Sequence, residues 1–477
     1  MSHGGGPVTE ESIFDETEEG AGGKGVVRIA VVAALGGFLF GYDSAVINGA
    51  VSAVQERFDV APGPLGFAVA SALLGAALGA LAAGRIADRI GRLQVMRIAA
   101  VFFFISAIGS AFAIGLGSLI LFRVIGGVGV GMASVIAPAY IAEISPARIR
   151  GRLGSLQQLA IVTGIFLSLL VDFLFATAAG GSSEQIWGMQ AWRWMFMAMA
   201  VPAIIYFALS LTIPESPRFL IAQGKVGAAT TILRRLLGET NIEIKIAKIQ
   251  QSMKRETKPS WRDMRGANGK IAGIVWVGLL LSVFQQFVGI NVIFYYSNIL
   301  WEAVGFNESQ AFVITVISAV INIATTLIAI ATVDKVGRKP LLLIGSVGMT
   351  VTLATLAFIF GAAPVVDGAP VLTGAQGPIA LIAANLFVIA FGMSWGPVVW
   401  VLLGEMFPNR MRAAALSLAA GGQWIANWLI TVSFPSLKDV SLALAYGLYA
   451  GFALLSLLFV ARFVRETKGR TLEDMHD

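Results

Sequence analysis

The sequence predicts an all-α membrane protein with twelve transmembrane helices in two six-helix bundles and short intracellular helices between them. The 477-residue chain is 57% hydrophobic and only 13% charged, whereas soluble domains average about a quarter charged. Apolar runs of about 20 residues recur along it, and each is long enough to cross the hydrocarbon of a bilayer. Basic residues gather between alternate runs, as the positive-inside rule requires.

The predicted spans form two sets of six, separated by a polar stretch. The first set lies at 26–50, 64–84, 95–113, 117–142, 153–177 and 194–213. The second set lies at 271–297, 309–332, 340–361, 377–403, 412–434 and 441–463. We therefore expect an N-terminal bundle over 26–213, an intracellular helical linker over 214–270 and a C-terminal bundle over 271–463.

Within the linker, Val226–Leu237 and Ile242–Met253 have the apolar spacing of short amphipathic helices. The linker is either a solvated connection or a regulatory element. Basic clusters follow the even-numbered spans, so both termini are predicted to be cytoplasmic in a multi-pass protein of the cell membrane. Residues 1–25 are acidic and are predicted to be a disordered tail, and 464–477 a second cytoplasmic tail.

Composition also excludes several kinds of chemistry. The chain has no cysteine, and its two histidines, His3 and His476, lie in the tails. No nucleotide-binding loop or nucleophile–base set is present, so we expect no enzyme activity, no cofactor and no metal site. The net charge of +6 is distributed between the spans, which indicates membrane topology rather than a nucleic-acid partner.

The two halves of the sequence repeat three motifs. Gly84–Arg92 after span two matches Asp334–Lys339 after span eight. Glu143 and Arg150 have the same separation as Glu405 and Arg412, and Pro214–Arg218 matches Arg465–Arg470. Repeats of this kind predict two parallel halves around a central path, with a binding site near the middle of the membrane.

These motifs, with Pro138–Glu143, Arg148–Gly151 and Gln285–Asn291, resemble the sugar porter family of the major facilitator superfamily. The similarity runs from about residue 27 to 473. It is closest to the bacterial proton symporters of the family and extends to the facilitative glucose transporters. It implies the major facilitator fold with an intracellular helical domain, which agrees with the count of spans.

Acids among the arginines of the repeated loops suggest a latch that holds the cytoplasmic side closed. The alternative is that these loops only set the topology, which explains the arginines but not the repeated acid. The predicted cytoplasmic gate comprises Asp88, Arg89, Arg92, Glu143, Arg150, Asp334, Arg338, Glu405 and Arg412.

Two ionisable residues stand out inside the spans. Asp43 in span one and Arg123 in span four fall at similar depth, so we expect them to pair. Separation of a buried pair favours protonation of the acid, which makes the two residues a candidate proton-coupling device. The resemblance implies the same role for Asp43, since facilitators carry asparagine there. The alternative is a static structural pair.

Amides and aromatic rings suit a sugar, because hydroxyl groups both donate and accept hydrogen bonds while ring faces are apolar. The alternative role of such amides is to join helices in lipid. Gly289 is predicted to break span seven and so to bring its amides together. The resemblance assigns sugar contacts to most members of the candidate set, which is Gln158, Gln285, Gln286, Asn291, Tyr295, Asn322, Trp395, Trp400, Gln423, Trp424 and Asn427.

Two positions depart from the proton symporters of the family. Ile165 replaces an amide on span five, and Met199 replaces an acid on span six. The expected function is import of a monosaccharide, a hexose or a pentose, with a proton by alternating access, in a protein for which a monomer suffices. The alternatives are a facilitative uniporter, an inositol or polyol symporter, and a non-transporting sugar sensor.

Overall fold

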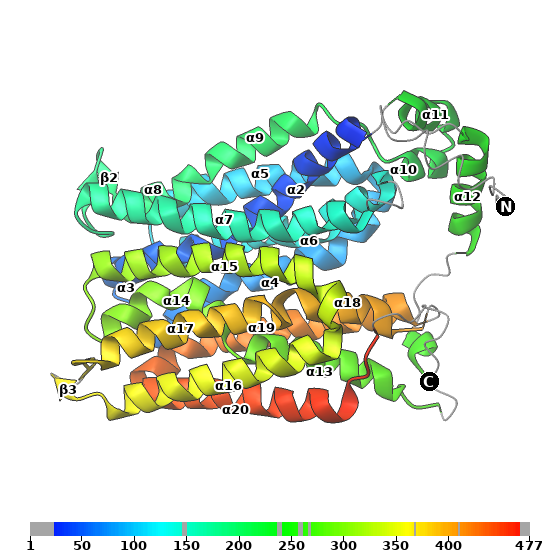
Figure 1. Cartoon of the computed structure of the whole chain (residues 1–477). Helices are drawn as coiled ribbons and strands as arrows, with labels where there is room; N and C mark the ends of the chain where they lie inside the picture. Colours follow the sequence, from blue (N-terminus) through cyan, green and yellow to red (C-terminus); the bar gives the residue numbers. More distant parts are fainter. Residues whose placement is uncertain are drawn as a thin grey trace, which may run out of the picture.

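The computed structural model describes residues 23–145, 150–235, 241–255, 261–265, 269–366, 369–408 and 411–467. Long helices run side by side between two ends of the molecule (Figure 1). We call one the linker end, because α10 (Pro217–Ala222), α11 (Val226–Arg235) and α12 (Ile242–Arg255) lie there. The other is the hairpin end, where the strand pairs β1–β2 (Gln185–Ile186, Met189–Gln190) and β3–β4 (Val365–Val366, Ala369–Pro370) lie.

The helices before the linker form the first half of the molecule. They are α2 (Gly23–Ala45), α3 (Ile47–Phe58), α4 (Pro62–Ile90), α5 (Arg92–Ala111), α6 (Leu116–Ile144), α7 (Arg150–Ala179), α8 (Ala191–Ala198) and α9 (Ala200–Ser210).

After the linker and its short helix η1 (Trp261–Met264), the helices form the second half. They are α13 (Gly273–Phe287), α14 (Ile290–Ala303), α15 (Glu308–Val336), α16 (Arg338–Ala362), α17 (Gln376–Gly392), α18 (Trp395–Met406), α19 (Arg412–Val440) and α20 (Leu442–Phe463).

The predicted twelve-helix count is confirmed. Among the described residues, eleven segments are long and apolar enough to cross a membrane, and four of them are paired helices: α2 with α3, α8 with α9, α13 with α14, and α17 with α18. The twelfth span is α19, which has 29 residues but carries Gln423 and Asn427 near its middle and is therefore less apolar. Both predicted linker helices form, as α11 and α12.

Glycines allow the helices of the first half to approach closely. A Cβ added at Gly127 or Gly131 of α6 would run into the carbonyl oxygens of Ala72 and Ala76 on α4. Gly41 of α2 meets α7 in the same way, at the carbonyl oxygen of Ile161. These contacts replace side-chain packing by backbone packing, which is how small residues hold helices together in lipid.

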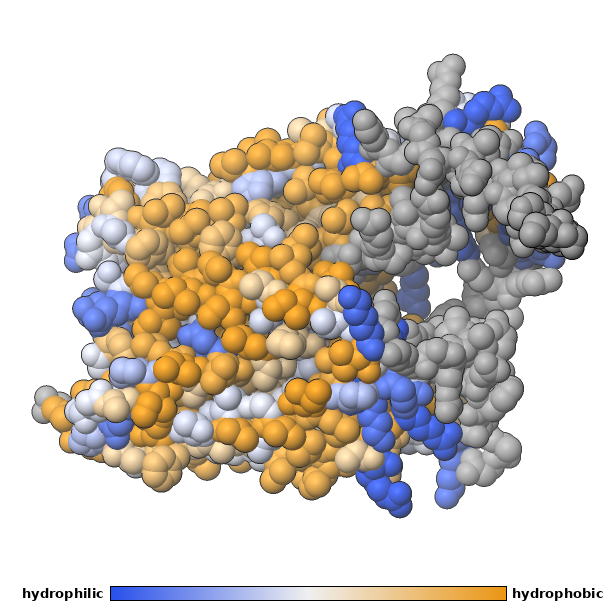
Figure 2. Space-filling view, in the orientation of Figure 1, coloured by the Kyte–Doolittle hydropathy of each residue, from blue (hydrophilic) through white to orange (hydrophobic). Residues whose placement is uncertain are grey.

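The halves meet along three pairs of helices: α4 with α19, α7 with α15, and α3 with α14. Figure 1 shows α7 and α15 lying side by side along much of the bundle. Figure 2 shows hydrophobic side chains over the middle of this face, with hydrophilic ones gathered at the two ends. This distribution fits a protein whose middle is surrounded by hydrocarbon chains.

The repeated loop motifs form two equivalent helix caps at the linker end. The carboxylate of Glu215 accepts hydrogen bonds from the backbone N–H groups of Arg92 and Leu93, each at 3.2 Å. In the second half, Glu466 accepts from Arg338 at 3.1 Å and from Lys339 at 3.0 Å. The first N–H groups of a helix have no partner within it, so each carboxylate stabilises the start of a helix, α5 or α16.

Each capped helix follows a glycine in the left-handed region. Gly91 has φ 96° and Gly337 has φ 106°, and both have ψ 163°. A Cβ at either position would approach the capping carboxylate. The turn therefore requires glycine twice over, for its backbone angle and for its lack of a side chain.

Removing either cap should destabilise the fold by a similar amount. We expect Glu215→Ala and Glu466→Ala each to cost about 0.5–2 kcal/mol, the usual range for a lost cap. The melting temperature of the purified protein in detergent measures the effect. The control is Glu243→Ala, because Glu243 is an exposed acid in the first turn of α12. Melting temperatures of the two cap variants equal to that of the control would contradict the capping role.

Candidate functional site

A buried ion pair lies within the first half. Asp43 of α2 and Arg123 of α6 are 1% and 2% exposed, and Arg123 Nη1 lies 3.5 Å from Asp43 Oδ1. The guanidinium donates its short hydrogen bond, at 2.7 Å, to the backbone carbonyl of Asp43. Both carboxylate oxygens lack a hydrogen-bond partner among the described residues. The predicted pairing is therefore present, and the carboxylate itself is held only by the loose ionic contact.

Gly126 makes room for this carboxylate. It lies three residues after Arg123, so both residues are on the same side of α6. A Cβ at Gly126 would lie 2.9 Å from Asp43 Oδ1 and would run into Ser106 Oγ of α5. Three helices thus enclose the pair.

The predicted break in span seven is present at Gly289. The residue has φ 85° and ψ 20°, and it separates α13, which ends at Phe287, from α14, which begins at Ile290. A Cβ there would lie 2.7 Å from the ring of Tyr449. Across the break, the amide of Asn291 donates to Gln286 Oε1 at 2.5 Å. The break therefore brings together amides that a straight helix would separate.

Gln285 joins three helices. Its amide nitrogen donates to the carbonyls of Trp395 at 2.8 Å and Gly396 at 3.1 Å, where α18 begins, and its oxygen accepts from Gln423 of α19 at 2.5 Å. Both donor hydrogens of Gln285 are thus used by the protein itself. By contrast, the amide nitrogen of Gln286 makes no hydrogen bond within the described part of the chain. Gln286 is therefore the better placed of the two to bind a ligand in this conformation.

Tyr295 links these amides to the ion pair. It lies one turn after Asn291 on α14, and its hydroxyl lies near Asn427 of α19 and Ser44 of α2. Ser44 directly follows Asp43 in the chain. Tyr295 of the second half therefore lies near the residue that follows the carboxylate in the first half.

The other predicted aromatic residues have different surroundings. The indole N–H of Trp395 donates to Leu342 O at 3.1 Å and to Ser346 Oγ at 2.9 Å, so this buried ring anchors α18 on α16. The ring of Trp424 lies 6.3 Å from that of Phe40 across the two halves. Trp400 is 46% exposed and does not join the buried amides.

The remaining amides line α7, α15 and α19. Gln158 is half-buried on α7, beside Gln157, which is buried with both polar side-chain atoms unpartnered among the described residues. Asn322 is buried on α15, and Asn427 Oδ1 accepts from Thr431 at 3.1 Å. The two unpartnered polar atoms of Gln157 make it a further candidate for the site.

The described gate residues pair within one half rather than between the halves. Arg92 Nη2 lies 2.9 Å from Glu143 Oε1, and Arg92 Nη1 lies 3.2 Å from Asp88 Oδ1. Arg89 is exposed, and the backbone of Arg338 is held by Glu466. The side chains of four predicted gate residues lie outside the described part of the structure: Arg150, Asp334, Glu405 and Arg412.

Sequence reasoning missed a third buried ionisable residue. Asp172 of α7 is fully buried, inside the predicted span 153–177. The rule that singled out Asp43, an acid within an apolar span, applies equally to Asp172. Asn48 of α3 was also missed, because only the fold reveals that its amide meets α14.

Comparison with known proteins agrees with this fold. Residues 29–477 match the family described as "Sugar (and other) transporter". The chain is 57% identical over 455 residues to the "Glucose transport protein" of Synechocystis, covering 95% of this chain and 97% of the relative. It is 40% identical to the "D-xylose-proton symporter" of Escherichia coli K12, over 94% of this chain and 95% of the relative.

Solved structures give the same assignment. The inward-open structure of the xylose transporter XylE from E. coli matches with a TM-score of 0.80 and 38% identity, covering 94% of this chain and 99% of the other. A structure of the same proton:xylose symporter with bound 6-bromo-6-deoxy-D-glucose matches with a TM-score of 0.76 and 38% identity, covering 95% and 99%. This chain belongs to the sugar transporter family, and its fold is that of the major facilitator superfamily.

Proposed function

We propose that this protein imports a monosaccharide together with a proton by alternating access, and that Asp43 carries the proton. The observation that supports this most directly is the geometry of the buried pair. Arg123 lies 3.5 Å away and favours the ionised form, while both carboxylate oxygens have no hydrogen bond among the described residues. A buried carboxylate held this loosely takes up a proton once its cation moves away.

The sugar is proposed to bind between the halves, mainly to amides of the second half. In this conformation those amides bind one another, as Asn291 with Gln286 and Gln423 with Gln285. Sugar hydroxyl groups could form hydrogen bonds to the same amide donors and acceptors, because a hydroxyl both donates and accepts. An empty site then leaves few buried amides unsatisfied, and binding exchanges one set of hydrogen bonds for another.

Tyr295 is proposed to couple the two events. Its hydroxyl lies near Asn427 in its own half and near Ser44 in the other. A sugar that engages Asn291 or Asn427 competes for Tyr295 and so loosens its contact with α2. The Asp43–Arg123 geometry then depends on whether the sugar site is occupied.

The substrate class is proposed to be a glucose-type hexose. The relative with 57% identity is named a glucose transport protein, whereas the xylose symporter is 40% identical. Ile165 on α7 places an apolar group where proton symporters of the family have an amide, so fewer hydroxyls are bound from that side. Met199, fully buried between α8 and α9, carries no proton, which leaves Asp43 as the proposed carrier.

The linker end is proposed to face the cytoplasm of the cell. Arg85, Arg89 and Arg92 lie there, as do Arg462 in the last turn of α20 and Arg465 after that helix, in agreement with the positive-inside rule. The two halves, 26–213 and 271–463, are proposed to rock against each other about the central site. Both halves belong to one chain, so one copy contains a complete path.

Replacing Asp43 by asparagine tests the proton assignment. The amide keeps the size of the carboxylate but cannot carry a proton, so Asp43→Asn should lose accumulation of sugar against a gradient. It should still exchange labelled for unlabelled sugar in proteoliposomes. The control is Asp439→Asn, because Asp439 is an acid at the end of α19 with an exposed side chain. Uphill accumulation by Asp43→Asn that a protonophore abolishes would show that the proton binds elsewhere.

Gln286 tests the sugar site. One buried hydrogen bond is worth about 0.5–1.5 kcal/mol, and an unsatisfied partner costs about 1–3. Gln286→Ala should therefore weaken equilibrium sugar binding by about ten- to a hundredfold. Gln310→Ala, an exposed glutamine on α15, serves as the control. An unchanged dissociation constant for Gln286→Ala, with normal folding, would remove Gln286 from the site.

A further inference from the structure

Asp172 is a buried acid that the proposed transport cycle does not use. Its side chain on α7 is 0% exposed. Oδ2 accepts a hydrogen bond from the backbone N–H of Gly49 at 3.2 Å, and Oδ1 has no partner among the described residues. One hydrogen bond from a neutral donor is little compensation for the water that an ionised carboxylate loses on burial.

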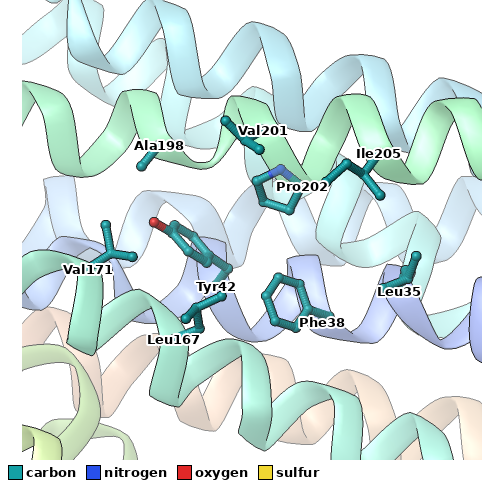
Figure 3. Close-up of a pocket in the computed structure, with 9 residues that line it drawn as sticks. All are labelled: Leu35, Phe38, Tyr42, Leu167, Val171, Ala198, Val201, Pro202 and Ile205. Atoms are coloured by element: carbon teal, nitrogen blue, oxygen red, sulfur yellow. The ribbon is translucent and has the colours of Figure 1, made fainter.

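The pocket beside the residue before Asp172 is apolar. Val171 lines this pocket of about 400 Å³ between α2, α7 and α9, and most of the other lining residues are apolar. Figure 3 shows Tyr42 projecting from α2 into this pocket, with its hydroxyl pointing between Val171 and Ala198. That hydroxyl has no hydrogen-bond partner in the described part of the chain.

The cations of the elements packed on α7 do not contact Asp172: Arg57 of α3 is exposed, and Arg28 of α2 lies toward the linker end. Arg123 of α6 contacts Asp43, and Arg193 of α8 donates to the carbonyls of Ala111 and Ala113. No described cation forms an ion pair with Asp172. The other ionisable groups of these elements are Arg28 and Tyr42 of α2, Glu56 and Arg57 of α3, Tyr140 and Glu143 of α6, and Glu308, Asp334 and Lys335 of α15.

The single hydrogen bond of Asp172 goes to a helix that closes the hairpin end. Gly49 is the third residue of α3, so its N–H belongs to the first turn and has no partner within the helix. A Cβ at Gly49 would lie 2.5 Å from Asp172 Cβ, so only glycine permits this approach. An ionised Asp172 thus caps α3 from a neighbouring helix, with the helix dipole in its favour.

The residue before Gly49 fastens α3 to the other half. Asn48 Nδ2 donates to Phe294 O of α14 at 3.1 Å, and Asn48 Oδ1 accepts from Asn298 N at 3.0 Å. One turn further on, Ser52 Oγ lies 3.2 Å from Glu302 Oε2. The contact between Asp172 and Gly49 is therefore next to the contacts that hold α3 against α14.

We propose that Asp172 is a second proton-binding site, separate from the Asp43–Arg123 pair, and that its proton occupancy is linked to the docking of α3 on α14. The ionised carboxylate accepts a stronger hydrogen bond from Gly49 than the neutral acid does, so it favours the docked helix. When α3 withdraws, the carboxylate loses that bond and a proton from solvent forms an O–H bond with it. By reciprocity, protonation favours the undocked state and docking returns the proton to solvent.

The test measures the position of α3 directly. The chain has no cysteine, so spin labels on Arg57→Cys of α3 and Ser309→Cys of α15, both at exposed positions, report one distance across the hairpin end. Double electron–electron resonance in lipid nanodiscs without sugar, from pH 8 to pH 5, gives the ratio of long to short distances. Acid should raise this ratio, by at most tenfold per pH unit for one proton.

Asp172→Asn keeps an oxygen for Gly49 but cannot ionise, so its distance distribution should not change with pH. Asp43→Asn should retain the pH response even where uphill transport is lost, which separates this inference from the proposed function. Asp172→Glu keeps an ionisable group and should respond with a shifted midpoint, which covers the case of an unstable asparagine variant. A response of Asp172→Asn equal to that of the parent, or no response in the parent, would overturn the proposal.

Discussion

The free-energy cost of burying a charged group away from water constrains where this protein can place ionisable residues. In the first half, an ionised Asp43 is offset only by Arg123 at 3.5 Å, and the low dielectric makes separation of two such charges costly. Neutralisation by a proton is the remaining route once they part. The glycine contacts that join α6 to α4 and α2 to α7, with Gly126 beside the carboxylate, keep the pair buried.

The central residues of the second half are neutral amides that form hydrogen bonds, not charged groups. Asn291 donates to Gln286 across the break at Gly289, and Gln423 donates to Gln285, so these amides partly satisfy one another in the empty site. The two halves therefore have the same scaffold, with matched caps by Glu215 and Glu466, but different chemistry at the centre. Coupling requires a contact between them, and we propose that Tyr295, whose hydroxyl lies near Ser44, supplies it.

The fold and the central polar residues could be predicted from the sequence, because apolar runs, basic loops and isolated polar residues each have a direct cost or benefit in lipid. The break at Gly289 and the pairing of Asp43 with Arg123 followed from the same reasoning. Hydrogen-bond partners that depend on helix packing could not be predicted. Gln285 donates to backbone carbonyls of α18, and Trp395 donates to α16. Asp172 accepts from Gly49 of a neighbouring helix. Such contacts depend on which faces of two helices pack together, and the spacing of residues in the sequence does not determine that.

The central claim is that sugar occupancy reaches the proton site through Tyr295. The most direct test is the number of protons taken up per sugar in proteoliposomes containing the Tyr295→Phe protein, measured with a pH-sensitive dye beside labelled sugar. The ring remains, so sugar exchange should persist, but the contact with Ser44 is lost and the proton:sugar ratio should fall well below that of the parent. A Tyr295→Phe protein that exchanges sugar and keeps the full ratio would contradict the account.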